Sequence, residues 1–187
     1  MSYADLVQAK AYMGISTSTD DALIYTLLDS ATAIIDAATG RNFAAKTETR
    51  YCSADEIDGD RLPLYGADLL AVTKLTNGDG VEITSANYTL LPRNASPKWI
   101  IKIHEDQSWA FTDGDSYVTV TGTWGYSATP PDDIVHACIR LAAFLYRQKD
   151  NSGDIDRPLV TGDGVTIMPS ALPSDVTNLL KRYQVRL

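Results

Sequence analysis

The sequence predicts an α+β fold: a small helical bundle formed by N- and C-terminal helices, with an inserted antiparallel β subdomain. Near both ends of the chain, apolar residues recur at intervals of three and four, as on one face of a helix. Between them the pattern changes to short alternating runs separated by turn residues, which is typical of antiparallel strands. We expect a single domain over residues 1–150, with a helical core at 1–41 and 130–150 and a β subdomain at 42–129, followed by a flexible loop and terminal helix at 151–187.

The N-terminal part of the chain carries two predicted helices. The first runs from Tyr3 to Met13 and ends at Gly14, because glycine is favourable just past a helix end. The second begins at Thr19 or Asp20, either of which can cap it, and ends at Thr39-Gly40. Its apolar stripe consists of Leu23, Leu27, Leu28, Ala31, Ile34, Ile35 and Ala38.

The β subdomain is predicted from alternation and from turn residues. Lys46 to Ser53 and Tyr117 to Thr123 alternate as half-exposed strands do. Two hairpins are expected as well: Val72–Leu75 with Val81–Ile83 around Asn77-Gly78-Asp79-Gly80, and Tyr88–Leu91 with Trp99–Ile103 around residues 92–97. Together these runs predict one small antiparallel sheet of about five or six strands.

Helical periodicity returns after Pro130-Pro131, a pair that suits the first turn of a helix. The stripe of this third helix is Ile134, Cys138, Leu141 and Leu145. Residues 148–164 lose the periodicity and gather Asp, Asn, Gly, Ser and Pro, which predicts a long loop. A last helix is expected from about Ser174, as its cap, to Val185.

Charge and composition exclude several classes of protein. The net charge is −8 and the pI is about 4.6, which disfavours tight binding to nucleic acid because that binding depends on clustered Lys and Arg. Met1 to Gly14 has no apolar run of signal-peptide length, and we expect no segment of the roughly 20 apolar residues that span a bilayer. The chain is therefore expected to be synthesised in the cytoplasm. Cys52 and Cys138 lie in different predicted elements, so we expect both to be reduced and to form no disulfide.

No catalytic or metal site is expected. His104 and His136 are the only histidines, and each is interpreted as structural. The acidic turns at Asp58 and Asp113 do not fit a calcium loop, because the fifth position is Leu62 in one and Tyr117 in the other. We expect no enzymatic activity and no cofactor.

Aromatic residues leave a second function open. They concentrate in the β subdomain as Trp99, Trp109, Phe111, Tyr117, Trp124 and Tyr126. Such side chains can form flat platforms for sugars, so a carbohydrate- or surface-binding β module is the alternative interpretation. The interpretation that these residues pack the β subdomain onto the helices is favoured over this alternative.

Six ordered segments carry a resemblance to a known family. They are Leu6–Ile15, Thr19–Ile24, Ala33–Phe43, Val118–Tyr126, Pro130–Ile134 and Leu141–Arg147. In this order they resemble head-tail connector (adaptor) proteins of tailed bacteriophages, and the resemblance covers most of residues 1–147. The tail from Gln148 matches no specific pattern.

The resemblance implies a non-enzymatic virion protein of the neck that forms a ring, commonly of twelve subunits, between the portal protein and a tail, stopper or head-completion protein. DNA would pass through the ring without sequence-specific binding, which a weakly acidic wall favours, and no membrane is involved. Portal contact is expected from the C-terminal segment, at Leu172, Val176, Leu179, Leu180, Tyr183, Arg186 and Leu187.

Overall fold

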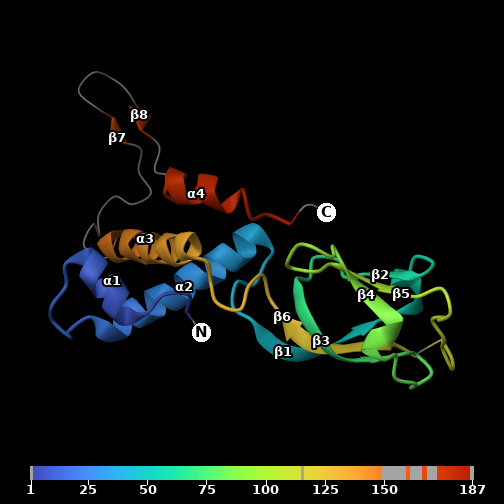
Figure 1. Ribbon diagram of the computed structural model, residues 1–187. Coiled ribbons are helices and arrows are strands. Elements are labelled where there is room, and N and C mark those ends of the chain that lie inside the picture. Colours follow the sequence, from blue (N-terminus) through green and yellow to red (C-terminus); the bar gives the residue numbers. More distant parts are fainter. Residues whose placement is uncertain (1, 115, 149–158, 161–165, 168–171, 186–187) are drawn as a thin grey trace. The chain divides into compact units, whose positions relative to one another are not determined.

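The computed structural model describes residues 2–114, 116–148, 159–160, 166–167 and 172–185. The chain divides into a helical unit, Met1–Thr39 with Pro131–Gln184, and a β unit that contains Gly40–Pro130. Four α-helices lie in the first, and two small antiparallel sheets lie in the second, in the part of the chain that the structure describes (Figure 1). The predicted α+β class, with helices contributed by both ends of the sequence, is confirmed.

The helical unit contains α1 (Leu6–Met13), α2 (Asp21–Thr39), α3 (Asp132–Gln148) and α4 (Ser174–Leu180). Helix α3 packs against all three of the others. The core between them is built from the buried stripes of the two long helices, which include Ile24, Leu28, Ala31 and Ile35 from α2 and Ile134, Ala137, Cys138, Leu141 and Ala142 from α3. Burial of these stripes holds the helices together.

Helices α1 and α4 differ from the prediction at three points: the start of α1, the cap of α4 and the end of α4. Helix α1 begins at Leu6 because Asp5 takes the N-cap position: its carboxylate accepts from the Gln8 backbone N–H at 2.7 Å, and the Gln8 side chain accepts from the Asp5 N–H. Ser174 as the cap of α4 was wrong, since Pro173 holds that position and makes no side-chain cap bond. Helix α4 ends at Leu180, earlier than Val185.

The expectation that no segment has the length of a membrane span is wrong for α2. By length and composition alone this helix could cross a bilayer. Its apolar character has a simpler source, because Ile24, Leu28 and Ile35 are fully buried in the helical core. The core helix of a small bundle satisfies the same criteria as a membrane span.

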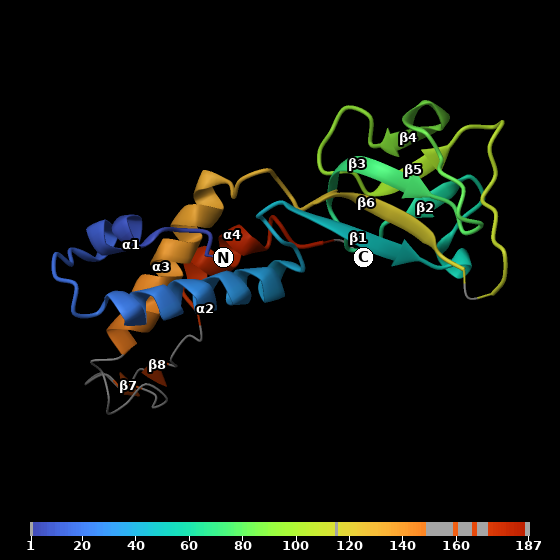
Figure 2. The same ribbon diagram turned by 90° about the horizontal axis from the view of Figure 1, so that it is seen from below.

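The β unit contains β1 (Lys46–Cys52), β2 (Arg61–Pro63), β3 (Leu69–Thr76), β4 (Tyr88–Leu91), β5 (Ile100–Ile103) and β6 (Val118–Trp124), with short 3₁₀ turns at Ala54–Glu56 and Ser85–Asn87. They form two three-stranded antiparallel sheets, ordered β1-β6-β3 and β2-β5-β4, which replace the single sheet predicted (Figure 2). Both sheets contribute to one core, made of Leu62, Leu64, Leu69, Leu75, Ile83, Ile101, Ile103, Val118, Val120 and Trp124. Dividing the strands between two layers buries this apolar face from both sides.

The two predicted hairpins are found. Tyr88–Leu91 pairs with Ile100–Ile103 in register. At the Asn77–Gly80 turn, the Asn77 N–H donates to the Val81 carbonyl at 2.8 Å and the Ile83 N–H donates to the Leu75 carbonyl at 2.9 Å. The second arm of this hairpin makes only one isolated bridge, between Thr76 and Glu82.

Two elements were not predicted. Strand β2 is only three residues long and follows the turn at Asp58–Asp60, so its sequence carries no alternation. Leu159–Val160 (β7), within the predicted loop, pairs antiparallel with Thr166–Ile167 (β8), just after it. The rest of that loop, residues 149–158 and 161–164, lies outside the described residues.

Candidate functional site

The predicted portal-binding residues lie on and after α4, and two of them are part of the core. Val176 and Leu180 are each 2% exposed within the helical unit. Leu172 and Leu179 are half-buried, and Arg186 and Leu187 lie outside the described residues. Their role in portal contact stays a prediction. The structure shows that the α4 stripe first serves to pack the helix.

Polar contacts fix α4 against α3. The Arg140 guanidinium reaches both carboxylate oxygens of Asp175, at 2.7 and 2.8 Å. At the other end of α4, the Tyr183 hydroxyl donates to Asp133 Oδ2 at 2.7 Å. Such a two-point arginine–carboxylate contact fixes geometry as well as contributing energy. The helix therefore presents a defined outer face to solvent.

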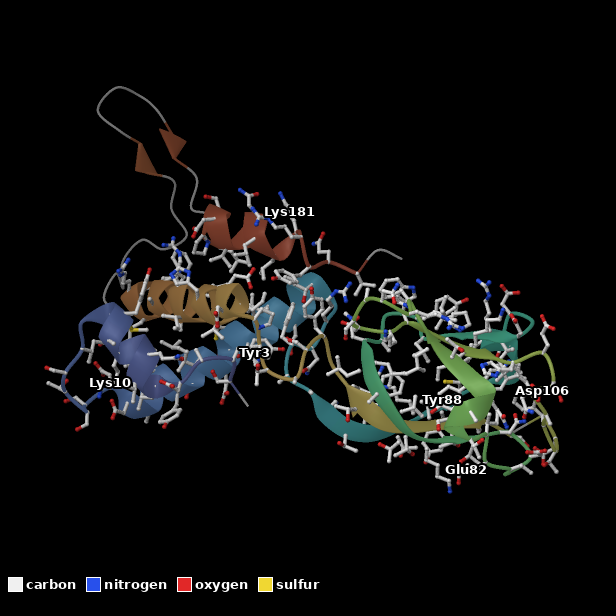
Figure 3. The ribbon with its side chains drawn as sticks, viewed as in Figure 1. Tyr3, Lys10, Glu82, Tyr88, Asp106 and Lys181 are labelled. Atoms are coloured by element: carbon white, nitrogen blue, oxygen red, sulfur yellow. The ribbon has the colours of Figure 1, made fainter. Side chains whose placement is uncertain are left out.

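The outer face of α4 carries residues that the sequence analysis did not single out. Asn178 on α4 is exposed, and so are Lys181 and Arg182 in the turn that directly follows it. Figure 3 shows Lys181 on the side of α4 away from α3. Two adjacent cations at the C-terminal end of a helix also suit its negative dipole end. These positions fall between those of the buried stripe, so an apolar pattern at helical spacing does not indicate them.

Three tyrosine–aspartate hydrogen bonds join distant segments of the helical unit. Tyr3 donates to Asp36, Tyr146 donates to Asp20 at 2.6 Å, and Tyr183 donates to Asp133. Burial raises the pKa of the Asp36 carboxyl, and the Tyr3 hydrogen bond acts in the opposite direction. These bonds tie the N-terminal segment and α4 to the two long helices.

One end of the β unit is strongly acidic. Because Cys52 pairs with Val118 and Thr76 pairs with Thr119, the ends of β1 and β3 and the start of β6 meet at the same end of their sheet. The loops that leave from this end are residues 53–60, 77–87 and 104–117, here called the acidic loops, and they contain no Lys or Arg. Their described carboxylates are Asp55, Glu56, Asp58, Asp60, Asp79, Glu82, Glu105, Asp106 and Asp113.

Figure 3 shows Glu82 and Asp106 at this end. Lys102, on β5, places its ammonium 3.0 Å from Asp60, and this hydrogen bond lowers the pKa of that carboxyl. The remaining carboxylates of the acidic loops face mostly solvent, which gives this end of the unit a negative potential.

Asn77 links two of the acidic loops. Its side-chain amide donates to the Ser108 carbonyl at 3.0 Å, and its carbonyl oxygen accepts from the Ala110 N–H at 3.0 Å. A Cβ on the adjacent Gly78 would lie 2.3 Å from the Phe111 ring, so this close approach of the loops requires glycine. The sequence pattern at both residues predicts a turn only.

Four of the six aromatic residues singled out in the sequence are buried or half-buried, and two are exposed. Trp124 is 1% exposed, and Trp109 and Phe111 pack against the core of the β unit. Trp99 is 51% exposed and Tyr117 is 48% exposed. Most of these side chains therefore pack within the β unit itself. Packing of the β subdomain onto the helices by these residues stays a prediction.

The residues with catalytic potential have structural surroundings. His104 is within 3.1 Å of the Thr89 hydroxyl, and His136 makes an edge-on contact with the Tyr12 ring. Cys52 and Cys138 are free thiols. Across the described ranges, no three His, Cys, Asp or Glu side chains gather as a metal site would require.

Comparison with known proteins gives a family and a shared fold. A family model for head completion proteins (HCP) matches residues 4–185, whereas no curated protein sequence matches the chain. Among solved structures, a chain from "Neck of empty GTA particle computed with C6 symmetry" is similar with a TM-score of 0.68 and 22% identity, over 99% of this chain and 91% of that one.

Two further solved chains are similar. One belongs to "Virion of native gene transfer agent (GTA) particle", with a TM-score of 0.66 and 21% identity over 99% of this chain and 91% of that one. The other belongs to "Neck of native GTA particle computed with C12 symmetry", with a TM-score of 0.65 and 23% identity over 97% and 89%. At these identities the likeness establishes a common fold.

Proposed function

Because this chain belongs to the head completion protein family, we propose that it is a structural virion subunit of the neck, a head-tail connector that acts without catalytic turnover. The observation that carries this proposal is the family match, which spans residues 4–185 and so includes both units. The fold shared with chains of gene transfer agent necks supports the same location.

We infer that the subunits form a ring around the path of the DNA. The similar solved chains come from particles whose necks were computed with C6 and C12 symmetry, which supports a cyclic arrangement and favours a dodecamer. A cyclic ring needs a head-to-tail contact, in which two different patches of each subunit meet. The ring is proposed to dock on the portal and to receive a tail or stopper protein on its other side.

The acidic loops fit a subunit that borders a DNA path without gripping it. Their carboxylates repel phosphate, and the loops contain no Lys or Arg that could release counterions on binding. DNA would then pass without sequence-specific contact.

Portal contact is proposed to involve the C-terminal segment. Val176 and Leu180 are buried against the helical unit, so the contact would use the exposed residues beside them, above all Lys181 and Arg182. Leu172, Leu179, Tyr183, Arg186 and Leu187 remain part of this proposal. A cationic face on α4 would suit an acidic surface on the portal.

A copurification experiment tests this assignment. The double variant K181E/R182E is expected to lose binding to the cognate portal ring, measured by affinity copurification and by counting rings on portals in electron micrographs. The matched control is Asp29→Lys, an exposed charge change on α2, which should bind normally.

Normal binding by K181E/R182E would remove α4 from the portal contact. Absence of any portal binding by the unmodified chain, with no ring in the purified protein or in the particle neck, would overturn the connector function itself.

A further inference from the structure

The two edge strands of the sheet β1-β6-β3 differ in how regularly they pair with β6. Strand β1 pairs with β6 over all seven of its residues without a register shift. Strand β3, at the other edge, has register shifts between Leu69 and Ala71 and between Val72 and Lys74. Bulges of this kind distort an edge and protect it from pairing with another strand. Strand β1 lacks that protection.

The outer edge of β1 is free to pair. Figure 2 shows β1 on the outside of the sheet, and the described backbone bonds of β1 all go to β6. One of its carbonyls, that of Glu48, also accepts from the Trp124 indole N–H at 3.1 Å. The strand contains no proline. A regular edge of this length is a ready template for an additional strand.

Charges that commonly protect an edge are neutralised on β1. Glu48 pairs with Lys46 at 2.7 Å and with Arg50 at 2.8 Å, and the Arg50 guanidinium lies over the Trp124 ring at 4.2 Å. The solvent face of β1 and β6 is formed instead by uncharged residues, namely Thr47, Thr49, Tyr51, Thr119, Thr121 and Thr123. An incoming strand would meet no unpaired charge on this face.

Strands β7 and β8 form a separate pair that joins neither of the two three-stranded sheets. Strands β7 and β8 have two residues each and pair only with each other among the described residues. An isolated two-stranded pair is marginally stable in water. The residue types Leu, Val, Thr and Ile nevertheless favour strands. This pair would gain stability by adding to an existing sheet edge.

We propose that β1 of each subunit accepts the β7–β8 pair of a neighbouring copy, extending its sheet across the contact. The inference rests on the proposed ring, and it names the two patches that a head-to-tail contact needs. Each chain then holds one accepting edge and one donated strand pair, so the contact is directional and can close into a ring. Main-chain hydrogen bonds would hold the strands, as in other cases of strand addition.

Cysteine crosslinking between differently tagged copies tests the proposal. In a C52S/C138S background, a chain with Thr49→Cys is mixed with a chain carrying a single cysteine at Leu159, Val160, Thr166 or Ile167. The mixture is assembled with the cognate portal and oxidised. Since a disulfide requires Cα atoms within about 7 Å, a mixed-tag dimer is expected at alternate hairpin positions only, as in paired strands.

Thr73→Cys is the matched control, because Thr73 is exposed on the bulged edge strand β3. It should give no mixed-tag dimer with any hairpin position. A second variant, Thr166→Pro in the unmodified chain, should lower ring yield roughly tenfold, since proline removes a strand hydrogen bond in every subunit contact, while the circular dichroism of the monomer stays unchanged.

Rings that form without a mixed-tag crosslink at any position would overturn the inference and leave the connector function standing. A crosslink from Thr49→Cys to the portal, or a crosslink formed only within one chain, would also overturn the inference and leave the connector function standing. Failure to form any ring with the unmodified chain would remove both.

Discussion

The helical unit and the β unit use their acidic residues in opposite ways. In the helical unit, aspartates hold the structure: Asp20 and Asp133 accept from tyrosine hydroxyls, and Asp21 pairs with Lys10 at 2.6 Å. In the β unit, the acidic loops collect carboxylates that mostly face solvent, such as Glu105 and Asp106.

The difference between the two units indicates where the net charge of −8 can act on other molecules. Partnered aspartates in the helical unit contribute to capping and to helix contacts, so their charge interacts with groups of the same unit. The acidic loops have no cation within them, and their charge is available to act on other molecules. Composition alone could not distinguish an acid that holds the structure together from one that faces solvent.

The largest expected effect on the free energy of unfolding comes from a substitution in the core of the β unit. Trp124→Ala should lower the free energy of unfolding by about 3–5 kcal/mol, because it removes the largest fully buried side chain and the contact with Arg50. All three tryptophans lie in the β unit, so denaturation followed by the fluorescence of the other two reports on that unit. Trp99→Ala, which removes a 51% exposed ring, should cost clearly less. Equal losses would contradict the assigned core.

The next effect concerns a thiol of the β unit. Burial, assisted by the nearby Glu56, raises the pKa of Cys52 from 9.0 to about 11. Two pKa units leave about a hundredfold less thiolate at pH 8, so alkylation of Cys52 should be about a hundredfold slower in the folded chain than in urea, as measured by mass spectrometry of its peptide.

The raised pKa of Cys52 also determines how the free energy of unfolding depends on pH. Because the folded state holds the thiol proton more tightly than the unfolded state, this contribution to stability is complete below pH 9 and is lost as the pH rises toward 11. Equal alkylation rates in folded and unfolded chains would show that Cys52 is exposed.

A smaller effect tests the tyrosine–aspartate bonds of the helical unit. Tyr146→Phe should cost about 1–2 kcal/mol, because Asp20 loses a hydrogen-bond donor. Thermal denaturation followed by far-UV circular dichroism measures the loss. Tyr25→Phe, on the 56% exposed Tyr25 of α2, is the control and should leave the midpoint unchanged. If the two variants behave alike, these bonds do not stabilise the unit.

The smallest effect belongs to the acidic loops. Glu105→Gln should change the free energy of unfolding by less than about 0.5 kcal/mol, since Glu105 is exposed. Chemical denaturation of this variant beside Tyr146→Phe gives the contrast directly. A loss comparable to that of Tyr146→Phe would mean that acids in the two units have the same role.

The sequence predicted the helical unit better than the β unit, because helical periodicity is local. The stripes of α2 and α3 follow from spacings of three and four, and the structure buries part of each, including Leu28 and Leu141. Leu27 and Leu145 are only half-buried, and the fully buried Ile24 was not among the predicted residues. The division of the strands into two sheets depends on pairings between distant segments, such as Lys46 with Trp124, which alternation does not encode. Strand β2 is too short to show a pattern.

The proposed binding residues show a different limit. An apolar stripe at helical spacing has the same appearance whether it packs inside one chain or docks on another. Val176 and Leu180 were assigned to the portal on this basis, and the structure buries both within the helical unit. Lys181 and Arg182 could be proposed for this contact only after the buried side of α4 was known.

In the ring with the proposed β1 contact, the two bulges of β3 would have a consequence for how assembly ends. If both edges of the sheet were regular, subunits could add in two ways and build open stacks. With one edge closed by bulges, a row of subunits always has one unfilled edge at its end. That edge is filled without adding another subunit only when the row closes on itself, so the number of subunits is set by the angle between neighbours and not by their concentration.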